Sequence, residues 1–286
     1  MNTRSTLYWP VRRELWENRY LYVGPLAAAA LVLFASTIHV ATTLPNRIAS
    51  LDALDAVKQQ AAIAMPFSMA ASVIFMVTYI AGAFYSLDAL YGERRDRSIL
   101  FWKSLPVSDR TTVLSKAAIP LLVLPLFIFT IALATQLVLW LLSTLILALS
   151  GMSPVPLWTR VPLLRMTLVM VYGLVVHALW HAPLYAWLLL VSAWARRVPI
   201  LWAVLPPMAI AMVEKMALGT SGVCHLIQYR LMGAIEVAFD FKARGHIVPI
   251  VTPARFLGTP GLWVGLLVAA ALLAAAVRLR RDREPI

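Results

Sequence analysis

Charged residues and cysteines are scarce in this 286-residue chain, and each scarcity restricts the class of protein to which the chain can belong. Asp, Glu, Lys and Arg make up 13% of the residues, and 61% of the residues are hydrophobic. A soluble domain carries about a quarter charged residues, so this composition indicates a membrane protein. The single cysteine, Cys224, excludes an intramolecular disulfide framework and a multi-cysteine metal site.

The placement of the charges argues against a nucleic-acid-binding protein, and the lack of one motif argues against a protein that binds nucleotide through its own phosphate-binding loop. The formal net charge of +12 invites comparison with nucleic-acid-binding proteins. However, the positive residues lie between apolar runs rather than on one polar face, which fits orientation in a bilayer and predicts no nucleic-acid partner. No Gly is followed by Lys anywhere in the chain, so the G-x-x-x-x-G-K-[ST] phosphate-binding loop is absent. Nucleotide-driven work by this protein would therefore need a nucleotidase on another chain.

Long apolar runs dominate what is present, and each is long enough to cross a bilayer core as a helix. The sequence predicts an all-α, polytopic membrane fold that forms a single transmembrane permease domain over residues 1–286. We expect six spans, at 20–44, 61–86, 117–149, 166–194, 198–218 and 257–279. The first run is too long for a signal-peptide core, so we expect it to be retained.

The distribution of Lys and Arg predicts the orientation of these spans. With six spans, both termini lie on one side, together with the segment 87–116 and the turn at Arg196–Arg197. That side carries 16 of the 25 Lys and Arg residues. The positive-inside rule then predicts cytoplasmic termini in a multi-pass protein of the cell inner (cytoplasmic) membrane.

Two segments outside the spans have helical patterns of their own. In residues 1–19, Val11 and Leu15 recur at helical spacing and Trp9 and Trp16 suit the headgroup region, which predicts an N-terminal interfacial helix. Residues 219–256 are too charged to span and too apolar for a free loop. There we expect a short outer amphipathic or re-entrant helix before the last span, ending near residues 242–245.

Ionisable residues within the spans are few, and they define the alternative functions. His177 and His181 are four apart, which places both on one helix face, but Ala178 stands where a zinc protease has its glutamate. We therefore expect no metal site and keep His177 and His181 only as weak metal candidates. A gradient-driven secondary carrier would use His177, His181 and Glu214. A non-transporting membrane anchor or assembly subunit of a redox system would place His39 or His177 near a cofactor.

Residues 87–116, called the charged segment below, contain the longest interval of charge in the chain. Ile99, Trp102 and Leu105 are three apart and predict a helix from Arg94 to Leu105. Such a helix is only about 18 Å long, too short to cross the membrane, so we expect it to lie beside the bilayer. Pro106 ends it. Ser108 is in the position of an N-cap for the third span, and Asp109 suits the positive end of that helix.

The run from Glu93 to Lys116 resembles the cytosolic segment between the second and third spans of type-2 ABC transporter permeases. The matching positions are Glu93, Leu100, Ser104, Leu105, Pro106, Val107, Ser108 and Lys116. Arg97-Ser98 stands where Gly-Thr is common in that family. The resemblance covers about a tenth of the chain; six spans, an interfacial helix and an outer re-entrant helix agree with it in general architecture.

The resemblance implies a permease subunit of an ATP-driven ABC exporter that is not itself an enzyme. A separate cytosolic ATPase would bind ATP and Mg, so no cofactor is expected in this chain, and a second permease chain would complete a homodimer or heterodimer. The charged segment would hold the coupling helix. The contact residues we expect there are Glu93, Arg95, Ile99, Trp102, Leu105 and Pro106. The short outer loops and uncharged spans favour an apolar or amphipathic substrate.

Overall fold

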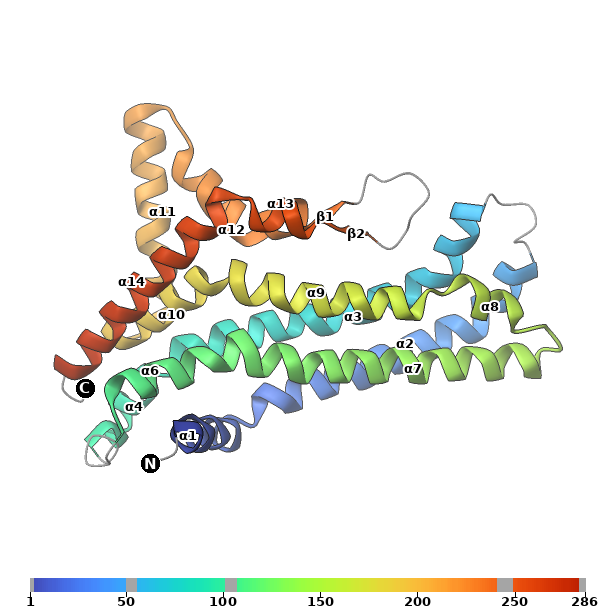
Figure 1. Cartoon of the computed structure of the whole chain (residues 1–286), viewed down its shortest axis with the longest axis horizontal. Coiled ribbons are helices and arrows are strands. Elements are labelled where there is room, and N and C mark those ends of the chain that lie inside the picture. The colour runs from blue at the N-terminus through green and yellow to red at the C-terminus, as the bar shows by residue number, and fades with distance from the viewer. Residues whose placement is uncertain (1–2, 50–55, 101–106, 241–248, 283–286) are drawn as a thin grey trace.

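The computed structural model describes residues 3–49, 56–100, 107–240 and 249–282, and it is 87% helical, as the apolar pattern predicts (Figure 1). The helices are α1 (Thr3–Glu17), α2 (Tyr20–Ala49), α3 (Ala56–Asp88), α4 (Tyr91–Arg95), α6 (Asp109–Ala118), the π-helix η2 (Ile119–Val123), α7 (Leu124–Leu149), α8 (Val155–Arg160), α9 (Leu163–Trp180), α10 (Ala182–Trp194), α11 (Pro199–Leu218), α12 (Gly222–Ala238), α13 (Pro253–Leu257) and α14 (Pro260–Asp282). The only strands within these residues, β1 (Phe239–Asp240) and β2 (Ile250–Val251), form an antiparallel pair.

Among the described residues, six helices are long and apolar enough to cross a membrane, which confirms the predicted number of candidate spans. They are Tyr20–Leu44, Ile63–Arg95, Asp109–Leu149, Val155–Trp180, Pro199–Leu218 and Pro260–Asp282. The chain is therefore a multi-span helical membrane protein.

The third of these helices is longer than predicted. It runs without interruption from Asp109 to Leu149, 41 residues, which at 1.5 Å per residue is about 60 Å. A bilayer core is about 30 Å thick, so this helix must extend well beyond it. The first ten residues, α6, are the extension at the end where the charged segment lies (Figure 1). Pro120 and Pro125 follow, and here the helix widens into η2 because proline withdraws an N–H from the regular ladder.

The prediction of one continuous span over 166–194 was wrong. Helix α9 ends at Trp180 and α10 begins at Ala182, with His181 as the cap residue of both. Pro183 lies in the first turn of α10. A proline at that position cannot donate to the carbonyl four residues earlier and its ring collides with it, which breaks the helix at His181. Only α9 is long enough to be counted as a span, and α10 is a shorter apolar helix.

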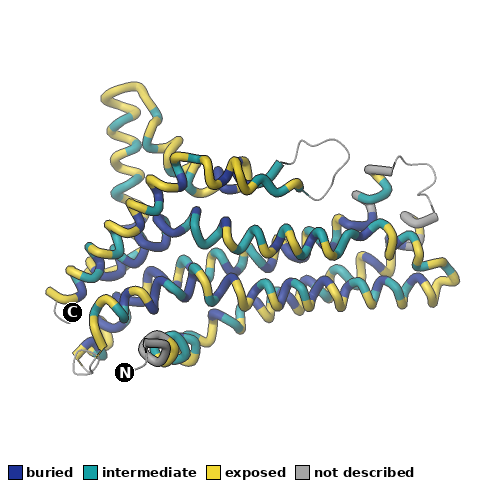
Figure 2. The backbone as a smooth tube through the Cα atoms, in the orientation of Figure 1, coloured by how far each residue is buried: buried dark blue, intermediate teal, exposed yellow. Residues whose placement is uncertain are grey.

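The long helices α2, α3, α7 and α9 run side by side, and buried residues line the space between them (Figures 1 and 2). One apolar cluster at one end of these helices includes Val40, Phe67 and Leu139. Another, at the opposite end, includes Leu21, Tyr85 and Leu189, and the half-buried Val11 and Leu15 of α1 pack on it. The apolar face predicted for α1 is therefore the face that holds this helix to the bundle.

Both chain ends, α1, α4 and α6 gather at this second end of the bundle (Figure 1). Helix α11 projects away from the long helices (Figure 1), and nearly all of its surface is exposed (Figure 2). The exposed side chains of α11 are mostly apolar, which suits lipid rather than water. Helix α12 returns from α11 and packs over α9, so a helix is present within 219–256 as expected. The predicted end near 242–245 was wrong, because α12 ends at Ala238 and strand β1 begins at Phe239.

Candidate functional site

The charged segment begins with α4, which is fastened to the end of α10. The backbone N–H groups of Leu90 and Tyr91 each donate to Ser192 Oγ at 2.9 Å. The guanidinium of Arg94, only 2% exposed, donates to the carbonyls of Ser192, at 3.0 Å, and Ala195. These bonds satisfy donors at the start of α4 and the last carbonyls of α10, groups that a helix leaves without intrahelical partners. Helix α4 and the end of α10 therefore form one unit.

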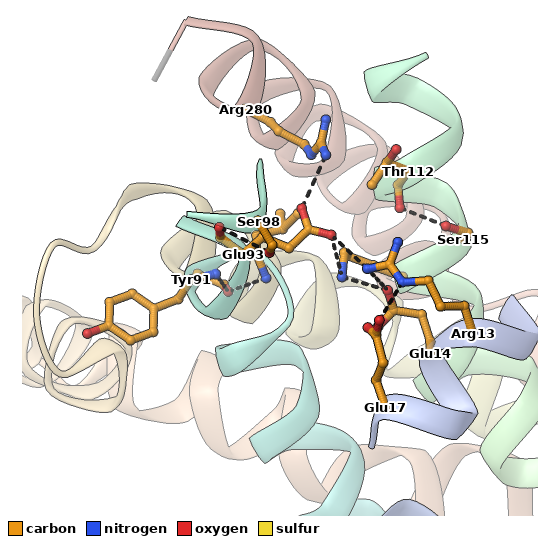
Figure 3. A network of polar contacts seen from close by, with 12 residues as sticks. Arg13, Glu14, Glu17, Tyr91, Glu93, Ser98, Thr112, Ser115 and Arg280 are labelled. Atoms are coloured by element: carbon orange, nitrogen blue, oxygen red, sulfur yellow. Dashed lines mark hydrogen bonds and ion pairs between the residues drawn. The ribbon is translucent and has the colours of Figure 1, made fainter. Parts of the chain in front are cut away.

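The carboxylate of Glu93, on the other face of α4, points into the protein rather than to solvent. The Glu93 side chain is 6% exposed. Its oxygens lie 3.2 Å from Lys116 Nζ of α6, 3.1 Å from Arg280 Nη2 of α14 and 3.5 Å from Arg13 Nη2 of α1 (Figure 3). Three elements distant in sequence therefore converge on one carboxylate of α4.

Further charges extend this contact into a closed network. Lys116 Nζ also donates to Glu14 of α1 at 2.8 Å, and Tyr85 OH of α3 donates to the other oxygen of Glu14 at 2.8 Å. Asp109, at the start of α6, accepts from Arg280. The three carboxylates Glu14, Glu93 and Asp109 thus face the three cations Arg13, Lys116 and Arg280; we call these six residues the inner network. Each of these charges has a partner of opposite sign, as burial requires, since an unpaired buried charge costs several kcal/mol. Arg13 also pairs with the exposed Glu17 at 2.9 Å, at the edge of the inner network.

The continuous helix predicted from Arg94 to Leu105 was wrong. Helix α4 ends at Arg95, and helical structure resumes at residue 98. Between them, Arg97 has a backbone φ of 57°, in the left-handed region that residues other than glycine rarely adopt. Asp96 caps α4, and its carboxylate binds the neighbouring Arg95 at 2.9 Å. The charged segment therefore turns sharply at Arg97.

The turn distributes the expected contact residues over two faces. Ile99 is buried, 1% exposed, and Glu93 belongs to the inner network, so both side chains face the bundle. Arg95 and Leu100 face outward; their exposed fractions are 53% for the Arg95 side chain and 59% for Leu100. The predicted contact residues Trp102, Leu105 and Pro106 lie outside the described residues.

The cap predicted for the third span is confirmed. Ser108 has an extended backbone, with φ −71° and ψ 149°, and its Oγ accepts from the N–H of Thr111 at 3.1 Å. Asp109 occupies the first turn of α6, where a carboxylate interacts favourably with the helix dipole. The sequence therefore located correctly the first residue of the third candidate span.

The two candidate histidines lie where α9 gives way to α10, His177 in the last turn of α9 and His181 between the two helices. The ring centroids of His177 and His181 are 5.0 Å apart, as the four-residue spacing predicts, and Tyr79 of α3 and Tyr185 of α10 lie against them. Among the residues that the structure describes, no group of three or more His, Cys, Asp or Glu side chains is arranged to hold a metal ion. His177 Nε2 lies 3.3 Å from the Pro120 carbonyl of η2 and 3.4 Å from Tyr185 OH, so this histidine joins neighbouring helices.

The remaining candidates for the alternative functions lie elsewhere. Glu214 accepts from Thr220 Oγ1 at 2.6 Å and from the N–H groups of Gly222 and Val223, at 2.6 and 2.8 Å. It therefore caps the first turn of α12, which explains why this carboxylate stands at the end of α11. His39 is exposed on α2.

Sequence reasoning missed Ser192, Glu14 and Tyr85, and it counted Arg280 only toward orientation. Lys116 stands directly before an apolar run of more than 30 residues, where a lysine either reaches the membrane interface or pairs with a carboxylate. Which carboxylate that would be depends on how α1, α4 and α14 pack together. Only the folded structure supplies that information.

The chain matches no protein-family model, and comparison with curated proteins and with solved structures gives no match either.

Proposed function

We propose that this chain is the permease subunit of an ATP-driven ABC exporter, coupled to a separate cytosolic ATPase through the charged segment. Two lines of support combine. The motif from Glu93 to Lys116 resembles the cytosolic segment of type-2 permeases, and it connects the end of the second candidate span, Ile63–Arg95, to the start of the third, Asp109–Leu149. ATP and Mg would bind the partner, since the chain has no phosphate-binding loop of its own, and the permease itself would not be an enzyme.

The observation that carries the proposal is the linkage of α4 to four other elements. Arg94 and Ser192 join it to α10, and Glu93 joins it to α1, α6 and α14. A displacement of α4 has to move these partners with it or separate buried opposite charges, and the second option costs several kcal/mol. Force applied to the charged segment would therefore reach helices that extend through the bundle.

The turn at Arg97 gives the charged segment an inner and an outer part. Glu93, Arg94 and Ile99 anchor it, while Arg95 and Leu100 are exposed for contact with another protein. On this proposal ATP binding closes the partner ATPases, the charged segment moves with them, and the spans tilt. A second permease chain would complete the translocation pathway, as the family resemblance implies.

The proposal is tested by purifying the tagged chain from its native membrane in mild detergent and identifying the proteins that accompany it. We expect a P-loop ATPase in the wild-type preparation and its loss when Trp102→Ala and Leu105→Asp are combined. The doubly substituted chain should still insert and purify in normal yield. Retention of the ATPase by this variant would contradict the coupling role. Transport that continues without any ATPase and follows the proton gradient would favour a gradient-driven carrier instead.

A further inference from the structure

A pocket of about 270 Å³ opens at the corner between α10 and α11. It is lined by Trp194 and Ala195 at the end of α10, by Arg196 in the turn and by Trp202 in the first turn of α11. Its wall adjoins the charged segment, because Arg94 of α4 donates to the Ala195 carbonyl. Small-molecule sites typically enclose about 300–1,000 Å³, so this pocket has room for a head group rather than for a whole amphiphile.

Contacts within the protein hold the walls of the pocket in place. The ring centroids of Trp194 and Trp202 are 4.8 Å apart and their planes are 78° apart, an edge-to-face pair. Trp187 Nε1 of α10 donates to the carbonyl of Ala203, the residue after Trp202, at 3.1 Å. Val198 in the turn has a backbone φ of 43°, in the left-handed region that a β-branched residue rarely adopts. Such a conformation persists only where the surrounding structure fixes it, so the corner is a defined structure rather than a loose connection.

Arg196 brings positive charge to the pocket with no acidic side chain beside it. Arg196 is exposed, and no carboxylate of the described residues pairs with it. None of the four lining residues is acidic. Trp194 and Trp202 are exposed as well. Indole rings settle at the level of lipid head groups, because the ring is apolar and its N–H is polar. The pocket therefore suits an anion at a membrane interface.

An exposed apolar face of α11 continues from the pocket. Four exposed residues lie on that face, at spacings of three and four along the chain: Trp202, Leu205, Ala209 and Met212. From Trp202 to Met212 the helix rises about 15 Å, which matches the hydrocarbon thickness of one leaflet, half of about 30 Å. The pocket and this face together therefore match the two parts of a phospholipid, a charged head group and an acyl chain.

We propose that the pocket binds the phosphate of an anionic phospholipid, with Arg196 as its cation, Trp194 and Trp202 beside the head group, and an acyl chain along the exposed face of α11. Hydrogen bonds from a guanidinium to a phosphate are charge-assisted and stronger than bonds between neutral groups. Basic pockets between spans bind anionic head groups in other membrane proteins. The adjacent Arg197 is exposed too, and its charge favours a net negative head group over a zwitterionic one.

Other occupants match only part of this surface. A soluble anion or an acidic protein loop would neutralise Arg196 but leave the apolar face of α11 uncovered. A phospholipid covers both. The lipid site does not depend on the exporter assignment, because binding to the purified chain needs no ATPase. Binding together with failed ATPase co-purification would keep the lipid site and remove the exporter, and co-purification without binding would do the reverse.

The test measures lipid binding to the delipidated full-length protein in neutral detergent through its thermal stabilisation. Phosphatidylglycerol is compared with phosphatidylcholine of the same acyl chains, and with glycerol 3-phosphate, which has the phosphate but no acyl chain. We expect phosphatidylglycerol to bind at least about fivefold more tightly than phosphatidylcholine, because one basic residue near an anionic head group contributes roughly that factor. Glycerol 3-phosphate should not stabilise the protein at the same concentration.

Three variants locate the binding. Arg196→Gln should weaken phosphatidylglycerol binding about fivefold. Trp202→Leu keeps the face of α11 apolar but removes one wall of the pocket, and it should weaken that binding roughly threefold. Arg110→Gln is the matched control, since it removes an exposed arginine of α6 at the same end of the bundle, and it should change binding by less than about twofold. Because Arg196 is exposed, lipid-free Arg196→Gln should unfold as wild type does, which separates binding from folding.

Four results would overturn the proposal. The first is equal binding of phosphatidylglycerol and phosphatidylcholine. The second is wild-type binding by Arg196→Gln or by Trp202→Leu. An equal loss from Arg110→Gln would show that diffuse surface charge, not the pocket, attracts the lipid. Stabilisation by glycerol 3-phosphate as strong as that by phosphatidylglycerol would assign the pocket to a soluble anion instead.

Discussion

Lys116→Met is the most decisive perturbation of the inner network. The Lys116 side chain is 3% exposed, and its Nζ lies 2.8 Å from Glu14 Oε1 and 3.2 Å from Glu93 Oε1. Methionine preserves the length and the apolar stem but leaves two buried carboxylates facing only Arg13 and Arg280. Removing one partner from a buried ion pair typically costs about 3–5 kcal/mol, so we expect Lys116→Met to lower the free energy of unfolding by about that amount.

The assay is thermal unfolding of the detergent-solubilised protein, with Arg110→Met as the matched control. Arg110 lies on the same helix and is exposed, so its loss should change stability by no more than about 0.5 kcal/mol. Adding Glu14→Gln to Lys116→Met restores equal numbers of carboxylates and cations. The double variant should therefore be more stable than Lys116→Met alone, with a coupling of about 0.5–3 kcal/mol. If Lys116→Met lowers stability no more than Arg110→Met does, the inner network does not hold the charged segment as described. The same conclusion follows if the effects of Lys116→Met and Glu14→Gln on stability are additive.

Three further changes test the charged segment, each by the same unfolding assay. Arg94→Ala should lower the free energy of unfolding by about 3 kcal/mol, because it removes a buried charge that holds the last carbonyls of α10. Arg95→Ala, at the exposed neighbouring position, should change it by no more than about 0.5 kcal/mol. Equal effects of the two substitutions would show that α4 is not oriented as described. Ser108→Ala removes the cap of α6 and should cost about 1 kcal/mol; no loss of stability would mean that the cap does not matter in the folded protein. Arg97→Gly should stabilise by roughly 1 kcal/mol, because glycine adopts a φ of 57° without strain; destabilisation would indicate that the left-handed turn is absent.

Periodicity and apolar run length predicted most of the fold. The number of candidate spans follows from runs of about 20 apolar residues, and the start of the third follows from Ser108 and Asp109. Both are local signals, and a helix needs only local bonds to form. The break at His181 had a local signal as well, Pro183, which the apolar run around it obscured.

The candidate site was less predictable because it depends on packing between distant segments. Glu93 pairs with Lys116, which is 23 residues further along the chain, and with Arg280, which is 187 residues further along. Nothing in the sequence spacing specifies either pairing. The burial of Ile99 and the exposure of Arg95 also depend on the turn at Arg97, which a helical pattern read from Ile99, Trp102 and Leu105 does not reveal.

The central claim is that the charged segment contacts a separate ATPase, and site-specific crosslinking tests it most directly. A photoreactive amino acid is placed at Leu100, 59% exposed beside the turn at Arg97, and in a second preparation at Leu141, 59% exposed on α7. Irradiation of native membranes should join the Leu100 position, and not the Leu141 position, to a P-loop ATPase, and the yield should change when ATP is added. Crosslinks from Leu100 to lipid alone, or to an ATPase equally from both positions, would contradict the assignment.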